Sequence, residues 1–417
     1  HVRMPSVFSH ILLFMRQMAF QQFWLHPPDG SAFARQELLF CELPAGHTFQ
    51  RDFVRLTGLH IADFTELSFA LLTLLVDDKR DKRIILRSNF ANLEARLPPN
   101  AVDDFLKHLS RTPTELRRWF ADPERQDESI SDQLFLPTPL LRAPLLAADQ
   151  SYRVYFPPLV FRALEEVVYR TLRSEQPMEF SSRFGPIFER HVGRCLEDSG
   201  VHAVAEAELM ARLPDRGKCV DFLVVEDDSN ILIDAKGVEM SRLGRVSHRA
   251  EIVFRSIKDS AGKAVTQGMD TLRRMALAAE AENRGFGRGE SFLIVVTFQP
   301  LHLGSSNELA SMFGPQLTDR LHRQFGQTLP MPLENVFFLS IDEFERLLAR
   351  VRNRSTTMLA ALRHAKVADA HAATRRFNFQ QHLEDLCPPG DRLPILQKAL
   401  DALCDRCMAR LTEVGNA

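Results

Sequence analysis

The fold of this chain is decided by two apolar runs and the polar turn that joins them: Val220-Asp221-Phe222-Leu223-Val224-Val225, Glu226-Asp227-Asp228-Ser229-Asn230 and Ile231-Leu232-Ile233-Asp234-Ala235-Lys236-Gly237. Runs of β-branched and aromatic residues bounded by turn residues predict two strands, and the polar residues between them predict a hairpin loop. Side chains alternate between the two faces of a strand. Asp234 and Lys236 therefore share one face, while Ile233 and Ala235 point the other way, towards a core.

The pairing of these strands decides which side chains meet. If Glu226 pairs with Ile231, Asp221 lies opposite Lys236 and diagonal to Asp234, within side-chain reach. Two adjacent carboxylates repel each other, and one is driven towards protonation unless a cation neutralises them. A divalent metal ion is the usual solution, and Mg²⁺ suits one or two carboxylates with water and phosphate. The pattern therefore predicts a metal site beside the amine of Lys236, which can steady an attacking water or the charge on a phosphate.

The spacing of these residues resembles a known motif. Asp221, followed on the next strand by Asp234-Ala235-Lys236, resembles the PD-(D/E)XK motif of restriction-endonuclease-like nucleases, although Val220 stands where the name of the motif has Pro. That family commonly carries a Glu on the helix before the core sheet, and Glu189 fits. The alternative is a surface hairpin with an ion pair across its strands, since a short motif also occurs by chance.

The resemblance covers roughly residues 177–350 and implies an α/β (α+β) fold with a restriction-endonuclease-like core, a mixed central sheet flanked by helices. It implies that Glu189, Asp221 and Asp234 hold Mg²⁺, with Mn²⁺ as a substitute, and that the Ala235 carbonyl completes the shell. Lys236 would be catalytic together with these three acids.

A chain of 417 residues favours two or three domains. We expect four segments: an N-terminal helical domain over 1–129, a hairpin and connecting helix over 130–176, the nuclease-like domain over 177–350 and a C-terminal helical region over 351–417. Within the nuclease-like domain the expected elements are a helix over 182–198, a strand over 201–210, the motif hairpin, a loop over 237–251, a helix over 252–284, strands over 291–298 and 336–339, and a helix over 343–352 capped by Ser340. Glu206 and Glu208, which alternate on the first of these strands, are expected to face solvent; the alternative is that one of them supports the metal ligands as a further acid.

The net charge of −2 means that any binding of nucleic acid must come from a local patch. Basic residues outnumber acidic ones between Lys236 and Lys263. Such a patch suits contacts to phosphates, and an exposed loop of mixed charge is the equally open alternative. The candidate contacts are Arg242, Arg245, Arg249, Lys263 and Gln267. Gln267 lies one helical turn after Lys263, and some branches of the family have a Gln-containing helix at this place.

The six cysteines are sparse and irregularly spaced, which predicts a reducing, cytoplasmic location and no disulfide framework. Cys404 and Cys407 form a C-x-x-C pair, with Cys387 upstream. We do not expect them to hold structural Zn²⁺, because the pair lies in an apparently continuous helix, where such cysteines often only pack. No apolar run reaches the length that spans a bilayer.

The sequence thus predicts a metal-dependent nuclease that hydrolyses DNA, without a membrane partner. The family context suggests a role in bacterial defence or in a mobile-element system. One alternative is a catalytically inactive nucleic-acid-binding or scaffold subunit of a larger complex. A second alternative is an interaction protein that works through its helical ends. A homodimer or a partner subunit fits each of these functions.

Overall fold

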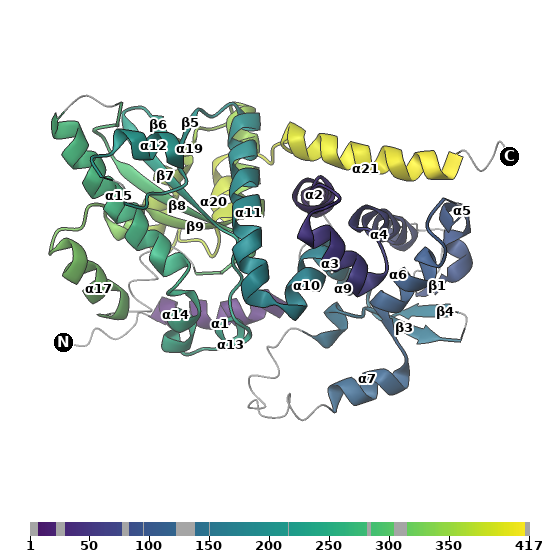
Figure 1. Cartoon of the computed structure of the whole chain (residues 1–417). Coiled ribbons are helices and arrows are strands. Elements are labelled where there is room, and N and C mark those ends of the chain that lie inside the picture. The colour runs from purple at the N-terminus through teal and green to yellow at the C-terminus, as the bar shows by residue number, and fades with distance from the viewer. Residues whose placement is uncertain are drawn as a thin grey trace. The chain divides into compact units, whose positions relative to one another are not determined.

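The structure is a computed structural model that describes residues 7–21, 30–76, 83–94, 96–121, 138–149, 151–215, 217–281, 285–303 and 315–412 (Figure 1). The chain divides into two compact units. His1–Ala19 and Ser181–Leu393 form the sheet unit, and Phe20–Phe180 and Pro394–Ala417 form the helical unit. The boundaries of these units differ from those of the four expected segments. The last helix, within Pro394–Ala417, belongs to the same unit as Phe20–Phe180.

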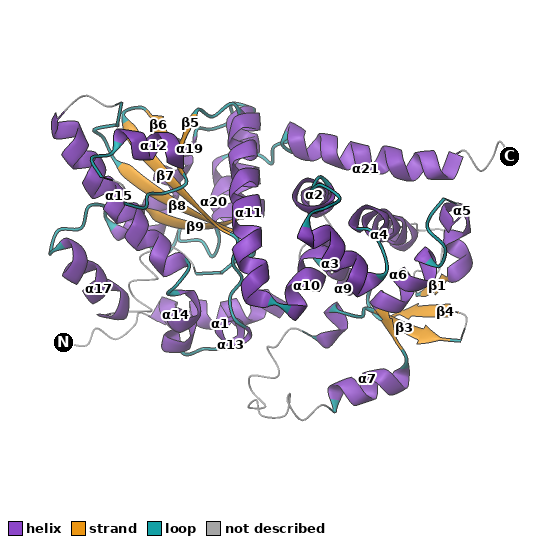
Figure 2. Cartoon of the chain, in the orientation of Figure 1, coloured by secondary structure: helices purple, strands orange, loops and turns teal. Residues whose placement is uncertain are grey.

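The sheet unit is built on a mixed five-stranded sheet with the order β5-β6-β7-β8-β9 (Figure 2). Its strands are β5 (Ala203–Ala205), β6 (Phe222–Glu226), β7 (Ser229–Lys236), β8 (Ser291–Thr297) and β9 (Val336–Ser340). The pairs β5/β6 and β6/β7 are antiparallel, whereas β7/β8 and β8/β9 are parallel. The predicted fold class, a mixed sheet flanked by helices, is confirmed.

The hairpin between β6 and β7 is tighter than the sequence suggested. Glu226 pairs with Ser229, so the predicted pairing of Glu226 with Ile231 is wrong by two residues. The turn consists of Asp227 and Asp228, whose φ angles of 46° and 60° are left-handed. Both positions of a type I′ turn need positive φ, and Asp tolerates this region better than most residues. A shift of two residues leaves every side chain on its predicted face.

Three expected elements around the hairpin are corrected. The expected strand over 201–210 is only β5, followed by helix α12 (Glu206–Arg212), because its Glu, Leu, Met, Ala and Arg residues favour a helix. The expected loop over 237–251 contains the short helix α13 (Arg242–Val246), which Ser241 caps by accepting a hydrogen bond from the Gly244 amide. The expected helix over 252–284 is two helices, α14 (Ala250–Ile257) and α15 (Ala261–Ala281).

The remaining elements of the sheet unit follow the expectation closely. Helix α11 (Pro177–Ser199) precedes the sheet, and α18 (Ile341–Arg352) begins with a capping box between Ser340 and Glu343. Helix α15 packs against β7 and β8, and α18 packs against β8 and β9. Leu232, Leu293 and Val295 form a buried apolar cluster with residues of α15, which include Ala264, Val265 and Met269. The other helices of this unit are α17 (Pro315–Phe325), α19 (Met358–Asp369), α20 (Phe379–Leu386) and most of α1 (Val7–Gln21).

The helical unit also contains a small sheet with the order β1-β4-β3-β2, formed by Ile84–Leu86, Ser151–Val154, Leu145–Ala148 and Ser110–Arg111. The predicted hairpin before the sheet unit is β3 and β4, while residues 122–137 lie outside the described residues. The helices are α2 (Gly30–Gln36), α3 (Thr48–Thr57), α4 (Ile61–Val76), α5 (Ala91–Glu94), α6 (Ala101–Leu109), α7 (Pro113–Phe120), α9 (Pro157–Glu165), α10 (Val167–Glu175) and α21 (Pro394–Thr412). A π-helix, Glu37–Cys41, continues α2, and short 3₁₀ turns occur at Arg87–Phe90, Pro139–Leu141 and, in the sheet unit, Leu333–Asn335.

Within the described residues, no single helix has the length and apolar composition needed to cross a membrane. Helices α3 and α4 meet the criterion only as a pair, with a bend of 57° between them.

Candidate metal centre

Asp221 and Asp234 lie opposite each other on the central hairpin. Phe222 pairs with Ile233, so the next position outward places Asp221, just before β6, across from Asp234 in β7. The two residues are 9% and 0% exposed, because the hairpin lies within a sheet that helices cover. Asp221 Oδ2 accepts a hydrogen bond of 2.6 Å from the amide of Ala235, which fixes one of its oxygens against the neighbouring strand.

Lys236 lies beside Asp234, as the alternation of side chains predicts. Its Nζ is 2.6 Å from Asp234 Oδ2, and its side chain keeps 21% exposure while that of Asp234 has none. Among the described residues, neither oxygen of Asp234 has a hydrogen-bond partner, and the ion pair to Lys236 is the one polar contact of its carboxylate. A buried carboxylate with so little compensation is costly unless a cation binds it.

Two glutamates complete this group of acids. Ligand oxygens of Glu189, Glu206 and Asp221 all lie within 4.8 Å of one another. Glu189 comes from α11, as expected, and Glu206 is the first residue of α12. We call Glu189, Glu206, Asp221 and Asp234 the acid cluster. The sequence analysis held a supporting role for Glu206 only as an alternative, because it expected a strand over 201–210 with this side chain in solvent. The signal that could have found it is the run of helix-forming residues after Ala205.

The pKa values of Asp221, Asp234 and Glu189 are all raised in the absence of a cation. Burial, and then the negative charge of Asp234, raise the pKa of Asp221 to about 7, and Lys236 offsets only part of this rise. Burial also raises the pKa of Asp234, against the opposing charges of Lys236 and Lys263. The pKa of Glu189 is raised by burial and by the charge of Glu206. A bound cation would stabilise the ionised carboxylates and so lower these pKa values.

Helix α15 holds the chain segment that leads to Asp221. Gln267 donates from Nε2 to the Cys219 carbonyl, and the Val220 amide donates to Thr271 Oγ1 over 3.3 Å. The buried Arg274 donates to the carbonyls of Lys218 and Asp215, at 2.9 and 2.8 Å. Gln267 was expected to contact nucleic acid, whereas the structure engages its side chain in positioning the backbone.

The other predicted nucleic-acid contacts fall into three groups. Lys263, on the first turn of α15, is exposed, and its charge acts on Asp234. Arg249 is exposed just before α14. Arg245 forms an ion pair with Glu239, so part of its charge is already neutralised. The side chain of Arg242 lies outside the described residues.

The cysteines considered for zinc are engaged separately. All six cysteines of the chain are free thiols. Cys387 donates to the Leu383 carbonyl over 3.7 Å, and Cys407 donates to the Glu66 carbonyl over 3.9 Å. In the part of the chain that the structure describes, Cys387, Cys404 and Cys407 belong to no group of three metal-ligating side chains.

The donors of the acid cluster fit a hard divalent cation. All four side chains offer carboxylate oxygens, the ligands that Mg²⁺ and Mn²⁺ prefer over nitrogen or sulfur. The buried oxygens of Asp234 that form no hydrogen bond are the clearest sign that a partner is needed there. Comparison with known proteins finds no family model, no curated protein and no solved structure that matches the chain.

Proposed function

We propose that this protein is a metal-dependent nuclease that hydrolyses phosphodiester bonds, with DNA as the expected substrate. The observation that carries the proposal is the acid cluster itself. Carboxylate oxygens of Glu189, Glu206 and Asp221 lie within 4.8 Å of one another. Asp234, across from Asp221, forms the one ion pair of the acid cluster among the described residues, with Lys236. The resemblance to PD-(D/E)XK nucleases in Asp221, Asp234 and Lys236 supports the same function.

Each residue of the cluster has a distinct role in this proposal. Asp221, Asp234 and Glu189 would hold Mg²⁺, with Glu206 as a further ligand and the Ala235 carbonyl as a predicted one. A bound Mg²⁺ supplies polarisation of the phosphate and a lower pKa for a coordinated water. Lys236 steadies the attacking water or the negative charge that develops on the phosphate. The amide of Ala235 orients Asp221 by its hydrogen bond.

The substrate would approach from the side of α14 and α15. Lys263 and Arg249 are exposed there and follow the hairpin in the chain. Their charges compensate phosphates, which supply most of the sequence-independent affinity for nucleic acid. We place the protein in the cytoplasm as part of the same proposal, because a reducing compartment suits its free thiols.

A cleavage assay on plasmid and oligonucleotide DNA with Mg²⁺, Mn²⁺ or EDTA tests the proposal. Lys236→Ala should lower the cleavage rate by about 10²–10³, the typical cost of one such electrostatic group. Its circular dichroism spectrum should stay that of the wild type. Lys398→Ala is the matched control, since it removes the same charge from an exposed side chain of the helical unit.

Two outcomes would contradict the proposal. Cleavage by Lys236→Ala at the wild-type rate would remove Lys236 from the mechanism. A wild-type protein that cuts neither DNA nor RNA with any divalent metal would favour the inactive scaffold subunit. In that case both lysine variants would bind nucleic acid with small losses of similar size.

A further inference from the structure

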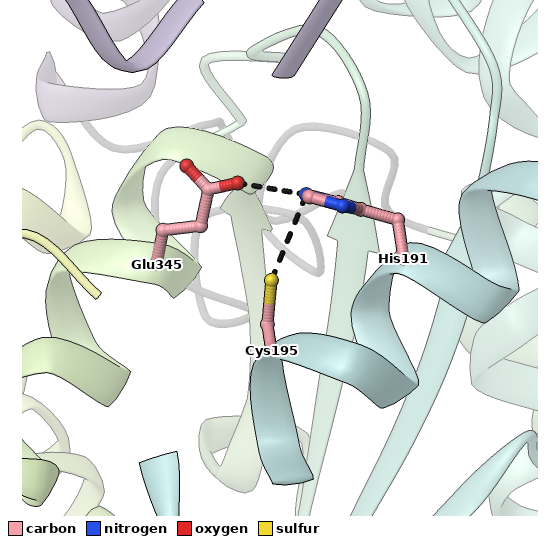
Figure 3. A group of neighbouring side chains, drawn as sticks. All are labelled: His191, Cys195 and Glu345. Atoms are coloured by element: carbon pink, nitrogen blue, oxygen red, sulfur yellow. Dashed lines mark hydrogen bonds and ion pairs between the residues drawn. The ribbon is translucent and has the colours of Figure 1, made fainter. Parts of the chain in front are cut away.

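A second cluster of metal-ligating side chains lies inside the sheet unit, apart from the acid cluster. It consists of His191 and Cys195 on α11 and Glu345 on α18 (Figure 3). The three residues are 2%, 0% and 3% exposed. His191 and Cys195 are four residues apart, so they share one face of α11. Glu189, two residues before His191, projects from a different face.

The contacts in this cluster converge on one atom. His191 Nε2 is 2.9 Å from Glu345 Oε1 and 3.6 Å from Cys195 Sγ. Figure 3 shows both contacts leaving the same end of the imidazole ring. The other ring nitrogen, Nδ1, has no hydrogen-bond partner among the described residues. The contacts at Nε2 therefore orient the ring.

The carboxylate and the thiol ask different things of Nε2. It carries either a hydrogen, which the carboxylate accepts, or a lone pair, which accepts the thiol hydrogen. A cation at the centre would be bound by all three atoms at once. The ligand atoms all lie within 4.8 Å of one another, close enough for one small ion to contact all three.

The distances and charges suit zinc in particular. Zinc bonds are about 2.0–2.1 Å to nitrogen, about 2.0–2.2 Å to oxygen and about 2.3 Å to sulfur, so tetrahedral donors lie roughly 3–4 Å apart. A thiolate, a carboxylate and a neutral imidazole together cancel the charge of a divalent ion. Such a neutral group loses less free energy on burial than an isolated charge does.

We propose that His191, Cys195 and Glu345 bind one zinc ion as a structural clamp between α11 and α18. The mixture of sulfur, nitrogen and oxygen ligands favours zinc over the hard cations expected at the acid cluster. One coordination position remains for a small ligand such as water. The clamp does not depend on the proposed nuclease function.

Metal analysis of the full-length protein tests this proposal. After dialysis against zinc and removal of the excess, the wild type should hold one zinc per chain that Cys195→Ser does not hold. Co²⁺ in place of zinc should give a thiolate-to-cobalt absorption band that requires a sulfur ligand. Saturating zinc should raise the melting temperature of the wild type by about 5 °C, since ligand binding to the folded state stabilises it.

Matched variants assign the site. Cys195→Ser should abolish the cobalt band and weaken zinc binding at least tenfold, and Glu345→Gln should weaken it as well. Cys387 is another buried cysteine of the sheet unit, and Cys387→Ser should keep the cobalt band and the zinc affinity of the wild type. Asp221→Asn, in the acid cluster, should keep them as well. A wild type that binds no zinc, or a cobalt spectrum without the sulfur band, would overturn the proposal even if the variants fail to fold. A cobalt band that persists in Cys195→Ser would overturn it too.

Discussion

Each unit of the molecule buries a group of carboxylates, and the two groups differ in the positive charge that accompanies them. In the helical unit, Arg406 of α21 contacts Glu37 at 2.6 Å and Glu66 at 3.0 Å. Arg410, one turn later, contacts Asp63 at 2.9 Å and Glu66 at 2.5 Å. Every acid in this group has a guanidinium partner, and Glu66 has two.

The acid cluster of the sheet unit has fewer positively charged partners. Its four carboxylates share one ion pair among the described residues, from Lys236 to Asp234. Burial raises the pKa values of Asp221, Asp234 and Glu189, as it does that of Glu37, and neighbouring acids add to the rise at Asp221 and Glu189. Buried acids that serve the fold are paired, whereas acids left short of positive charge are candidates for a bound cation.

The largest effect is expected in the helical unit. Arg406→Met keeps the aliphatic stem but removes the guanidinium, and so leaves Glu37 and Glu66 with less compensation in a buried setting. It should lower the free energy of unfolding by about 3 kcal/mol, because the side chains of Glu37 and Glu66 are buried although that of Arg406 is 38% exposed. Urea denaturation of the full chain measures this.

The control is the exposed ion pair between Arg55 and Glu175, whose side chains are 58% and 42% exposed. Arg55→Met should change stability by less than about 1 kcal/mol, since exposed pairs contribute little. Equal losses in the two arginine variants would mean that the buried network has no special weight. The helical unit would then give no evidence that pairing with arginine stabilises its buried carboxylates.

A smaller effect of opposite sign is expected at Asp221. Its pKa of about 7 lies above that of the unfolded chain, so folding retains a proton that the unfolded state releases. Stability of the metal-free wild type should therefore fall as pH rises from about 4 to above 7. Asp221→Asn cannot ionise, so its advantage over the wild type should grow by about 1–3 kcal/mol between pH 5 and pH 8.

Denaturation in EDTA at the two pH values measures this difference. Asp259→Asn, at a side chain that is 88% exposed, is the control and should show no such growth. If the difference in free energy of unfolding between Asp221→Asn and the wild type is equal at both pH values, ionisation of Asp221 does not destabilise the fold. The acid cluster would then need no cation.

Local patterns in the sequence predicted much of this site. The alternation of apolar and polar residues in Ile231–Gly237 placed Asp234 and Lys236 on one face, and the capping box at Ser340 located the start of α18. Glu189 lies on α11, which contains the helix predicted over 182–198. These features depend on contacts between residues that are close in the chain, which a sequence displays directly.

The failures concern turns and distant contacts. The hairpin register depended on two aspartates that adopt positive φ, and propensity alone did not indicate that both would do so. Glu206 was only an alternative because the expected strand extended into the helix-forming residues of α12. The grouping of α21 with the first half of the chain depends on ion pairs such as Arg406 with Glu37, which are 369 residues apart. No local pattern reports such a contact.

Titration of the metal-free protein with Mn²⁺, followed by calorimetry at pH 8, tests the central claim most directly. The account predicts that the wild type binds at least one Mn²⁺, that Asp221→Asn and Asp234→Asn weaken binding at least tenfold, and that Glu206→Gln weakens it less. Arg406→Met, studied where it remains folded, should bind as the wild type does. A wild type without measurable Mn²⁺ binding, or undiminished binding in Asp221→Asn and Asp234→Asn, would contradict the claim that a cation completes the acid cluster.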